Sequence, residues 1–378
     1  PACRYHSSCG GCQLQHLSYQ NQLLWKHNRI TQTLKRIAGI DIEVKPVLGM
    51  ADPWNYRNKA LFRLNLSNEK FQFGFLGRSS NTVIDIEQCP VQNELNNKLL
   101  QQIRTGLEKN PSWRTNIAKG KLPVTSVMLR SSIATKLSMI VLNHDGCSDN
   151  NESLSELAKI IENQTRDLQT SIISSAKNRG DIRTVQYTGN PSIEEVIYPF
   201  RYKISAQSFF QVNSIQARKL YETVVSLAGT PALVFDFYCG TGNYSLSLSQ
   251  VADKVVGIDS ETAAIKNASE NAALNRIGNT VFITGNVERW HELIDPHLIP
   301  DLIIINPPRG GCSKKLIATL LQAKAEKIIY ISCNPATLAR DLRHLVAESY
   351  LVNTVQPIDM FPHTTHVETV VLMSRVDK

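Results

Sequence analysis

Two cysteines of the sequence stand at places where a thiol could do chemistry. Cys333 follows an apolar run and precedes Asn-Pro and a helical pattern in "YISCNPATLARDL", which predicts a position at a helix N-terminus. The positive end of a helix dipole lowers the pKa of a nearby thiol, and the thiolate is its reactive form. A buried, inert thiol is the alternative for Cys333. Cys239, inside "DFYCGTGNYSL", is expected to pack, and Cys147 and Cys312, in polar glycine-adjacent stretches, are assigned no role.

The glycine-rich stretch "VFDFYCGTGNYSLSLS" has the pattern of a cofactor loop. Asp236 ends a strand pattern, Gly240 and Gly242 predict a tight loop, and a helix follows. Ligands of open α/β sheets bind at the carboxyl ends of the strands. Ser245 stands where a dinucleotide site would have a third glycine, and Asp259 closes the next strand, where it could bind ribose hydroxyls. The pattern favours S-adenosylmethionine over NAD, with a purely structural turn as the alternative.

The stretch "INPPRGG" puts Asn306 at the end of a further predicted strand. Enzymes that methylate exocyclic amines also carry Asn-Pro-Pro, normally followed by an aromatic residue that stacks on the target. Arg309 follows here, and an arginine suits a phosphate or a substrate carbonyl better. Amine methylation is disfavoured by this residue but stays open. The short spacing of His363, His366 and Glu368 in "HTTHVE" does not favour a metal site.

The N-terminal cysteines form a candidate metal site. Cys3, Cys9 and Cys12 are spaced C-x5-C-G-G-C, and Cys89 precedes Pro90 much later in the chain. Four thiolates bind zinc or an iron–sulfur cluster. Structural zinc sites favour two close pairs, so a group of three plus a distant cysteine favours a [4Fe–4S] cluster, with zinc left open. Disulfides are not expected in a reducing compartment.

The composition narrows the class of protein that could carry these groups. A chain of 378 residues predicts more than one domain. With 42% hydrophobic and 20% charged residues, we expect a soluble, cytoplasmic protein, and no apolar run is long enough to predict a membrane span. The net charge of +8 and the pI near 9.0 indicate a polyanionic partner.

Periodicity divides the chain near residue 200. The first part, 1–200, reads as an α+β domain, with a helix at 17–38 that could pack on the catalytic domain. Its strand patterns are "IEVKPVLGM", "KALFRLNLS", "KFQFGFLGR" and "TVIDIEQCP", expected in an antiparallel sheet, with helical patterns at 92–109 and 152–167. The second part, 201–378, alternates helices with continuous apolar strands, typical of a parallel sheet covered on both faces. Its last two strand patterns, 349–361 and 366–376, have no helix between them and predict an antiparallel hairpin.

Several motifs together resemble the RNA uracil-C5 methyltransferases. "SFFQVN", "DFYCGTGNYSL", "NPPRG", "SCNP" and "DMFPHTTHVE" follow the family's order, and "CGGCQLQH", "WNYRNKA" and "VIDIEQCP" extend the resemblance to nearly the whole chain. The resemblance implies a C-terminal Rossmann-like α/β domain that binds S-adenosylmethionine, with a mostly parallel sheet and an antiparallel last strand. It also implies an α+β N-terminal and central domain that carries a [4Fe–4S] cluster on Cys3, Cys9, Cys12 and Cys89.

The resemblance assigns roles at individual positions. Cys333 corresponds to the nucleophile, and Glu368 to the base that removes a proton. Tyr238 replaces the more usual Phe and Asp259 the more usual Glu, which preserves their chemical type. Contacts to the methyl donor are expected from Gln211, Tyr238, Gly240, Asn243, Asp259 and Asn306.

Methylation at C5 of uracil requires a thiol nucleophile and a general base, independently of the resemblance. C5 of uracil is a poor nucleophile, and thiolate attack at C6 makes it carbanion-like, after which a base must remove the C5 proton. The target is expected to be a flipped uridine in a loop of structured RNA, with Arg57, Lys59 and Arg78 as candidate backbone contacts. The cluster cysteines resemble those of the ribosomal enzymes, which favours 23S ribosomal RNA over transfer RNA as the substrate. We expect the enzyme to act as a monomer. An amine methyltransferase and a non-catalytic RNA-binding or sensor protein are the alternatives.

Overall fold

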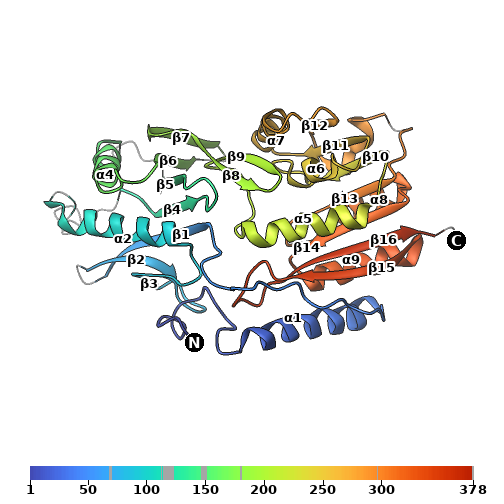
Figure 1. Ribbon diagram of the computed structural model, residues 1–378, viewed down its shortest axis with the longest axis horizontal. Coiled ribbons are helices and arrows are strands. Elements are labelled where there is room, and N and C mark those ends of the chain that lie inside the picture. Colours follow the sequence, from blue (N-terminus) through green and yellow to red (C-terminus); the bar gives the residue numbers. More distant parts are fainter. Residues whose placement is uncertain are drawn as a thin grey trace.

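The computed structural model describes residues 1–67, 70–111, 113, 123–145, 151–178, 181–295 and 297–376. Within these ranges the chain forms two seven-stranded sheets and a separate two-stranded hairpin. The two sheets lie side by side, the first on the left of Figure 1 and the second on the right. None of the helices in these ranges has the length and apolar character that crossing a membrane requires.

The first sheet has the strand order β3-β2-β1-β4-β5-β6-β7. Its strands are β1 (Lys59–Ser67), β2 (Lys70–Leu76), β3 (Val83–Asp85), β4 (Ser126–Ser131), β5 (Ser138–His144), β6 (Thr170–Asn178) and β7 (Asp181–Thr188). Neighbouring strands pair antiparallel except β5 and β6, which are parallel because helix α4 (Asn151–Gln164) crosses between them. The antiparallel pairing expected for the strand patterns before residue 90 is confirmed for β1, β2 and β3, and the complete sheet is mixed because of β5 and β6.

Helices α2 (Glu94–Lys109) and α4 (Asn151–Gln164) cover one face of this sheet. Leu99 and Ile103 of α2 and Leu157 of α4 share a buried apolar cluster with Phe62 and Phe73 of the sheet. Asn93 begins α2, because its side chain accepts a hydrogen bond from the backbone N–H of Asn96 at 2.8 Å. The opposite face of the sheet is thereby free to meet the rest of the molecule.

The second sheet has the strand order β12-β11-β10-β13-β14-β16-β15. Its strands are β10 (Leu233–Phe237), β11 (Lys254–Asp259), β12 (Thr280–Thr284), β13 (Leu302–Ile305), β14 (Lys327–Ser332), β15 (Tyr350–Ile358) and β16 (Glu368–Arg375). β10 to β14 pair in parallel, and β16 is antiparallel to both β14 and β15. The mostly parallel sheet with an antiparallel last hairpin, predicted from the apolar runs, is confirmed.

Helices cover both faces of the second sheet, which explains the near-continuous apolar runs of its central strands β10, β11, β13 and β14. These helices are α5 (Ser214–Ala228), α6 (Asn243–Leu248), α7 (Thr262–Leu274), α8 (Lys314–Ala323) and α9 (Pro335–Glu348), with the short η3 (Val287–Glu292). Ile303 packs on one face in a cluster with Leu342 of α9. Ile304, its neighbour on β13, packs on the other face with Leu220 of α5.

Helix α1 (Tyr19–Thr33) packs on the second sheet's side of the molecule, along α9. It continues into a π-helical turn, η1 (Leu34–Ala38), and stops at Gly39, whose φ of 70° suits a glycine at a helix end. Ile30 and Leu34 are buried in the same cluster as Leu338 and Leu342 of α9. The helix expected at 17–38 is thus present, and it lies against the C-terminal half of the chain.

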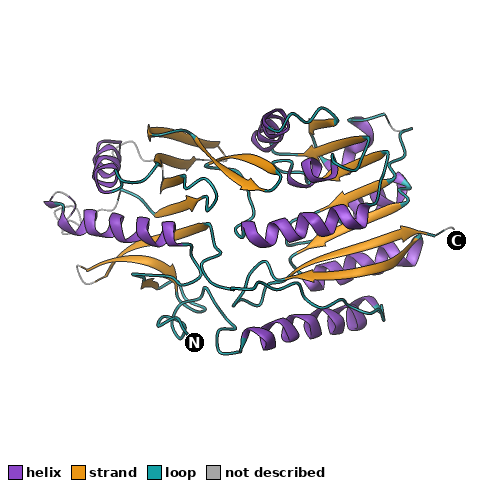
Figure 2. Cartoon of the chain, in the orientation of Figure 1, coloured by secondary structure: helices purple, strands orange, loops and turns teal. Residues whose placement is uncertain are grey.

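The first expected strand, "IEVKPVLGM", is not formed as a strand. Val44 and Leu48 instead make isolated parallel bridges with Val355 and Ile358 of β15. Pro46 lies between them and has no N–H group to donate, so a continuous ladder is interrupted there. The segment therefore runs along the edge of the second sheet, and Figure 2 draws it as loop.

A hairpin joins the two halves of the molecule. β8 (Ser192–Ile197) and β9 (Phe200–Ser205) form their own two-stranded sheet. Ile193 and Tyr202 of the hairpin are buried in one cluster with Met128 and Met139 of the first sheet and Leu220 of α5. The apolar core is consequently continuous from one sheet to the other.

Candidate active site

Cys333 and Glu368 come together because of the register of two antiparallel strands. Cys333 follows the last residue of β14, and Glu368 is the first residue of β16. The ladder ends with Ser332 opposite Thr369, and Cys333 and Glu368 are the residues that come next to this pair along the two chains, so both stand at the same end of it. The Glu368 carboxylate is near enough to the thiol to raise the pKa of Cys333. The two groups assigned as nucleophile and base are therefore neighbours.

Glu368 is a buried carboxyl group, with 5% of its surface exposed. Burial disfavours its charged form and raises its pKa to about 7. Among the described residues, none donates a hydrogen bond to this carboxyl group or forms an ion pair with it. A carboxyl group with a pKa near neutrality can hold or release a proton under working conditions, which suits a general base.

The Cys333 thiol is half-buried, and its pKa is raised rather than lowered. Burial is the main cause and the nearby Glu368 carboxylate adds to it, while the positive charge of Arg309 acts in the opposite direction. The expectation that the helix N-terminus lowers this pKa is wrong in direction. Asn334, not Cys333, caps helix α9, and its side chain accepts the Ala336 N–H at 3.1 Å. An amide of the first helical turn thus bonds to the cap instead of to the thiol.

Arg309 is held beside Cys333 by the start of helix α9. Its backbone carbonyl accepts hydrogen bonds from the Asn334 side chain at 3.2 Å and from the Thr337 hydroxyl at 3.3 Å. The loop after β13 is thereby fixed to the loop after β14, while the Arg309 residue stays exposed. An exposed guanidinium at this position can reach a substrate oxygen.

The glycine-rich loop after β10 has the backbone that the sequence predicted. Gly240 and Gly242 have φ angles of 55° and 83°, and a Cβ on Gly242 would meet Leu246 at 3.0 Å. The Gly240 N–H donates to an Asp259 carboxylate oxygen at 2.9 Å, which ties the loop to the end of β11. Tyr238 has a φ of 63°, a backbone conformation that is uncommon outside glycine and is frequent at functional sites.

Asp236 is the acidic group whose importance sequence reasoning missed, since it was taken only as the end of a strand. It is fully buried, and burial raises its pKa to about 7. The Ser245 hydroxyl donates to its Oδ2 at 2.6 Å, which explains the serine at the position of the third glycine. Its Oδ1 is buried without a hydrogen-bond partner in the described part of the chain. An unpartnered carboxylate oxygen beside this loop fits a donor that carries ammonium and sulfonium groups.

Tyr244 connects the expected donor contacts to the base and was also missed from the sequence. It is buried, and its hydroxyl accepts a hydrogen bond from the Asn306 side chain at 3.4 Å. Burial raises the pKa of Tyr244 well above its usual range, the Glu368 charge adds to this rise, and the Gln211 side chain lowers it. Asn306, Gln211, Tyr244 and Glu368 therefore meet in one place. Asn243, at the start of α6, is buried beside them in the chain.

Phe209 is a further candidate that the sequence did not single out. Its residue is 69% exposed, although Ser208 and Phe210 on either side are buried. It lies in the same loop as Gln211, which is 5% exposed. An exposed aromatic ring next to a donor site can stack on a planar base. Its signal in the sequence was the paired "FF" of "SFFQVN".

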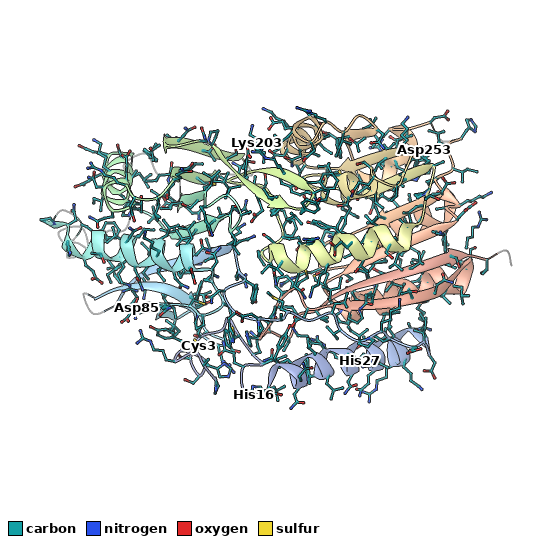
Figure 3. The ribbon with its side chains drawn as sticks, viewed as in Figure 1. Cys3, His16, His27, Asp85, Lys203 and Asp253 are labelled. Atoms are coloured by element: carbon teal, nitrogen blue, oxygen red, sulfur yellow. The ribbon has the colours of Figure 1, made fainter. Side chains whose placement is uncertain are left out.

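The four N-terminal cysteines lie around one cavity of about 870 Å³. Cys3, Cys9, Cys12 and Cys89 are all half-buried, and Figure 3 places Cys3 between the region of Asp85 and the start of α1 near His16. Burial raises the pKa of the Cys9, Cys12 and Cys89 thiols, the last to about 12, and repulsion between neighbouring thiolates adds to this. In the described ranges, no group of three or more ligand side chains is placed to hold a single metal ion.

Three other residues considered in the sequence analysis are buried in the protein and make structural contacts. His363 is buried, its Nε2 lies 3.1 Å from the Pro53 carbonyl and its Nδ1 lies 3.2 Å from the Gln22 amide, so both ring nitrogens are engaged. Cys239 is buried in the donor loop. Cys312, expected in a polar stretch, is buried too, with its N–H donating to Asp341. Cys147 lies outside the described residues.

Comparisons with known proteins find relatives in both sequence and structure. A family model described as tRNA (uracil-5-)-methyltransferase matches residues 18–376. An uncharacterized RNA methyltransferase of Clostridium acetobutylicum is 38% identical over 391 residues, covering 100% of this chain and 84% of that protein. One of Listeria innocua is 38% identical over 387 residues, covering 99% and 83%. The crystal structure of the Pyrococcus abyssi tRNA (uracil-54, C5)-methyltransferase in complex with S-adenosyl-L-homocysteine matches with a TM-score of 0.75 and 27% identity, over 96% of this chain and 85% of that one.

Proposed function

The chain belongs to the tRNA (uracil-5-)-methyltransferase family, whose members methylate C5 of uracil in RNA with S-adenosylmethionine, and we propose that Cys333 and Glu368 are its catalytic pair. The observation that supports this assignment best is the ladder between β14 and β16, which makes the thiol and the buried carboxyl group neighbours.

In the proposed reaction, the thiol activates the base before methylation. Addition of the Cys333 sulfur to C6 forms an S–C6 bond and moves the electron pair of the C5–C6 double bond to C5 and the O4 carbonyl. S-adenosylmethionine, when bound, supplies the methyl group that C5 takes up. Glu368 then removes the proton from C5, and the returning electron pair restores the double bond as the S–C6 bond breaks. Arg309 is placed to stabilise the thiolate and the enolate oxygen.

The donor is proposed to bind over the loop after β10. Its expected contacts are Gln211, Tyr238, Gly240, Asn243, Asp259 and Asn306. Support comes from the unpartnered Asp236 oxygen and from Asp259, which has free lone pairs beyond its two backbone hydrogen bonds. Phe209 is proposed to stack on the flipped uracil, because its exposed ring precedes Gln211.

The proposed substrate is a uridine in a loop of 23S ribosomal RNA, methylated by a monomer in the cytoplasm. Transfer RNA is the second candidate, because the matched family and the similar Pyrococcus abyssi enzyme are both described as acting on it. Residues 1–200 are proposed to bind RNA and residues 201–378 to catalyse the transfer. This division follows the two sheets, although α1 packs on the second of them.

The test of the substrate is a nucleoside analysis. Purified protein and S-adenosylmethionine are incubated separately with unmodified 23S ribosomal RNA and with unmodified transfer RNA, and the RNA is digested. We expect 5-methyluridine from the ribosomal RNA only. 5-Methyluridine from transfer RNA alone would replace the ribosomal assignment, and a methylated exocyclic amine would refute methylation at carbon.

The N-terminal cysteines are proposed to hold a [4Fe–4S] cluster rather than a zinc ion. The four thiols line one cavity. A cluster of four irons spans more space than one ion, so its cysteine ligands stand farther apart. Such a cluster would join the N-terminal turns to the segment around Cys89, because its irons would be bound by thiolates from both.

A further inference from the structure

Three cationic side chains gather on the first sheet beside the loop of Gln211. Lys59 of β1 stands directly opposite Arg130 of β4, and Arg57 lies just before it in the chain. Side chains directly opposite in an antiparallel pair project to the same face. Within the described residues, none of the three forms an ion pair with a carboxylate. The cluster therefore carries positive charge without a compensating group.

Each of the two arginines of this cluster uses part of its donors within the protein. The Arg130 guanidinium donates to the carbonyl oxygens of Ser205 at 3.1 Å and Ser208 at 2.9 Å. The Arg57 Nε donates to the Lys59 carbonyl at 3.1 Å. The Lys59 ammonium group makes no hydrogen bond with any described residue. Lys59 is thus the member with all three donors available.

The surroundings of Lys59 make its charge costly in the free protein. Burial, reinforced by the charges of Arg130 and Arg57, lowers the pKa of Lys59 to about 8. Burial also lowers the pKa of Arg130 to about 10. A lysine held among like charges is stabilised by an anion that brings opposite charge, since this removes the repulsion.

The cluster lies next to the part of the site that would receive the base. The Asn58 N–H donates to the Val212 carbonyl at 2.9 Å, and the Asn58 side chain donates to the Gln211 carbonyl at 3.1 Å. Together with Arg130 on Ser208, these bonds fix both ends of the short segment that carries the exposed Phe209. Lys59 follows Asn58 directly, so the backbone of Lys59 is one residue away from a residue that holds the Phe209 segment in place.

The face of β1 that carries Lys59 continues away from the active site as a mixed basic and apolar surface. Ala60 and Phe62 point to the buried cluster under α2, so Lys59, Leu61 and Arg63 occupy the other face. Leu61 is 43% exposed. This face borders the cavity of the N-terminal cysteines, to which Arg57 and Arg78 also contribute.

We propose that Lys59, supported by Arg57, binds the backbone phosphate that flanks the flipped uridine of the RNA substrate. The inference rests on the proposed function, because it takes Phe209 and Gln211 as the place of the base. A single-stranded RNA presents a phosphate next to every base, and a free ammonium group beside an exposed aromatic ring matches that repeat. Arg130 is a positioning residue in this arrangement, since both of its contacts hold the loop.

The test compares Lys59 with a lysine on a distant part of the molecule. Lys59→Met removes the charge and keeps the length of the side chain. Lys254→Met is the matched control, because Lys254 is exposed at the amino end of β11, the edge of the second sheet opposite the donor loop. Binding of a labelled oligouridylate of about twelve nucleotides is measured by anisotropy at increasing KCl, without a methyl donor.

Lys59→Met is expected to weaken binding about three- to tenfold at low salt. The slope of log affinity against log salt should also fall by about 0.7, the value for one phosphate contact on a single strand. Lys254→Met should leave both quantities unchanged, and Lys59→Arg should restore most of the affinity. Equal slopes for Lys59→Met and Lys254→Met would overturn the proposal.

A second measurement separates phosphate binding from a structural role. The melting temperature of Lys59→Met without RNA should equal or exceed that of the wild type, because a repelled charge is removed. Inorganic phosphate, compared with chloride at the same ionic strength, should stabilise the wild type more than the variant. A variant that melts well below the wild type and responds equally to phosphate would contradict the proposal.

Methyl transfer to uridine is assayed on the wild type in parallel. If the wild type forms 5-methyluridine but Lys59→Met keeps the wild-type salt slope, the phosphate site is wrong and the proposed function stands. If the slope falls but no 5-methyluridine forms, the phosphate site stands and the function is wrong.

Discussion

The Cys333 thiol and the N-terminal thiols are placed by two different kinds of structure. Cys333 directly follows the central strand β14, whose ladder with β16 ends beside Glu368. Cys3, Cys9 and Cys12 lie in a run of turns with few ladder bonds, among them a single bridge from Cys9 to Gly77. The comparison teaches that strand pairing brings Cys333 and Glu368 together without any ligand, whereas the proposed cluster would add links among thiols that are held by turns.

The two regions are nevertheless in contact. The backbone N–H groups of Gln13 and Leu14, just after Cys12, donate to the His363 carbonyl at 3.0 and 2.9 Å. A short loop separates His363 from Glu368. Lys26 of α1 holds the start of the same connection between β15 and β16, through a buried ion pair with Asp359 at 2.5 Å. Disorder among the N-terminal cysteines should therefore reach the base indirectly. The following predictions separate these direct and indirect effects.

The largest effect is expected from Cys333→Ala. Without the sulfur no bond to C6 forms, so methyl transfer should fall by at least about 10⁴-fold. S-adenosylmethionine binding, measured by calorimetry, should stay within about twofold of the wild type, because the donor loop is a separate element. Cys239→Ala is the matched control and should still form the product. Loss of activity in Cys239→Ala with retention in Cys333→Ala would reverse the assignment.

The next effect concerns the N-terminal region. Protein purified without oxygen should contain about four irons per chain, and Cys89→Ser should lose nearly all of them. Its kcat should fall only severalfold, because the ladder that places Cys333 and Glu368 is intact and only their N-terminal support is loosened. Metal analysis and kinetics check this, with Cys312→Ser as the control. Stoichiometric zinc without iron would refute the cluster.

A smaller effect is expected on stability and its pH dependence. The pKa of Glu368 is raised to about 7 in the folded protein, above its usual value near 4.3, so its burial destabilises the fold progressively as pH rises from about 4.3 to about 7, after which the effect levels off. Glu368→Gln should therefore be about 1–3 kcal/mol more stable than the wild type at pH 8 and no more stable at pH 4.5. Thermal unfolding at both pH values measures this. Equal differences at the two pH values would contradict a buried, titrating carboxyl group.

The sequence predicted the second sheet well, because its central strands are buried on both faces and read as near-continuous apolar runs. It also predicted the stop of the first helix at Gly39 and the tight loop at Gly240 and Gly242. Local patterns could not show that Cys333 lies near Glu368, since this depends on the pairing of two strands that are distant in the chain. The direction of the Cys333 pKa was wrong for the same reason: burial and a distant carboxylate outweigh a local helix end.

Local sequence patterns also could not predict three further features, because each depends on residues that are distant in the chain or on burial. "IEVKPVLGM" has the apolar content of a strand, but Pro46 and the edge position along β15 leave only isolated bridges. The unpartnered oxygen of Asp236 follows from complete burial at the end of β10, which a single residue type cannot reveal. The exposure of Phe209 between two buried neighbours depends on Arg130 and Asn58, both far away in the sequence.

The covalent intermediate tests the central assignment most directly. Glu368→Gln keeps the Cys333 thiol but cannot take the C5 proton, so addition and methyl transfer should proceed and elimination should stall. Incubated with substrate RNA and S-adenosylmethionine, this variant should accumulate a methylated RNA–protein species that survives denaturing electrophoresis, and mass spectrometry should locate the link at Cys333. The double variant Cys333→Ala, Glu368→Gln should form none. Free 5-methyluridine product from Glu368→Gln at the wild-type rate, with no linked species, would contradict the account.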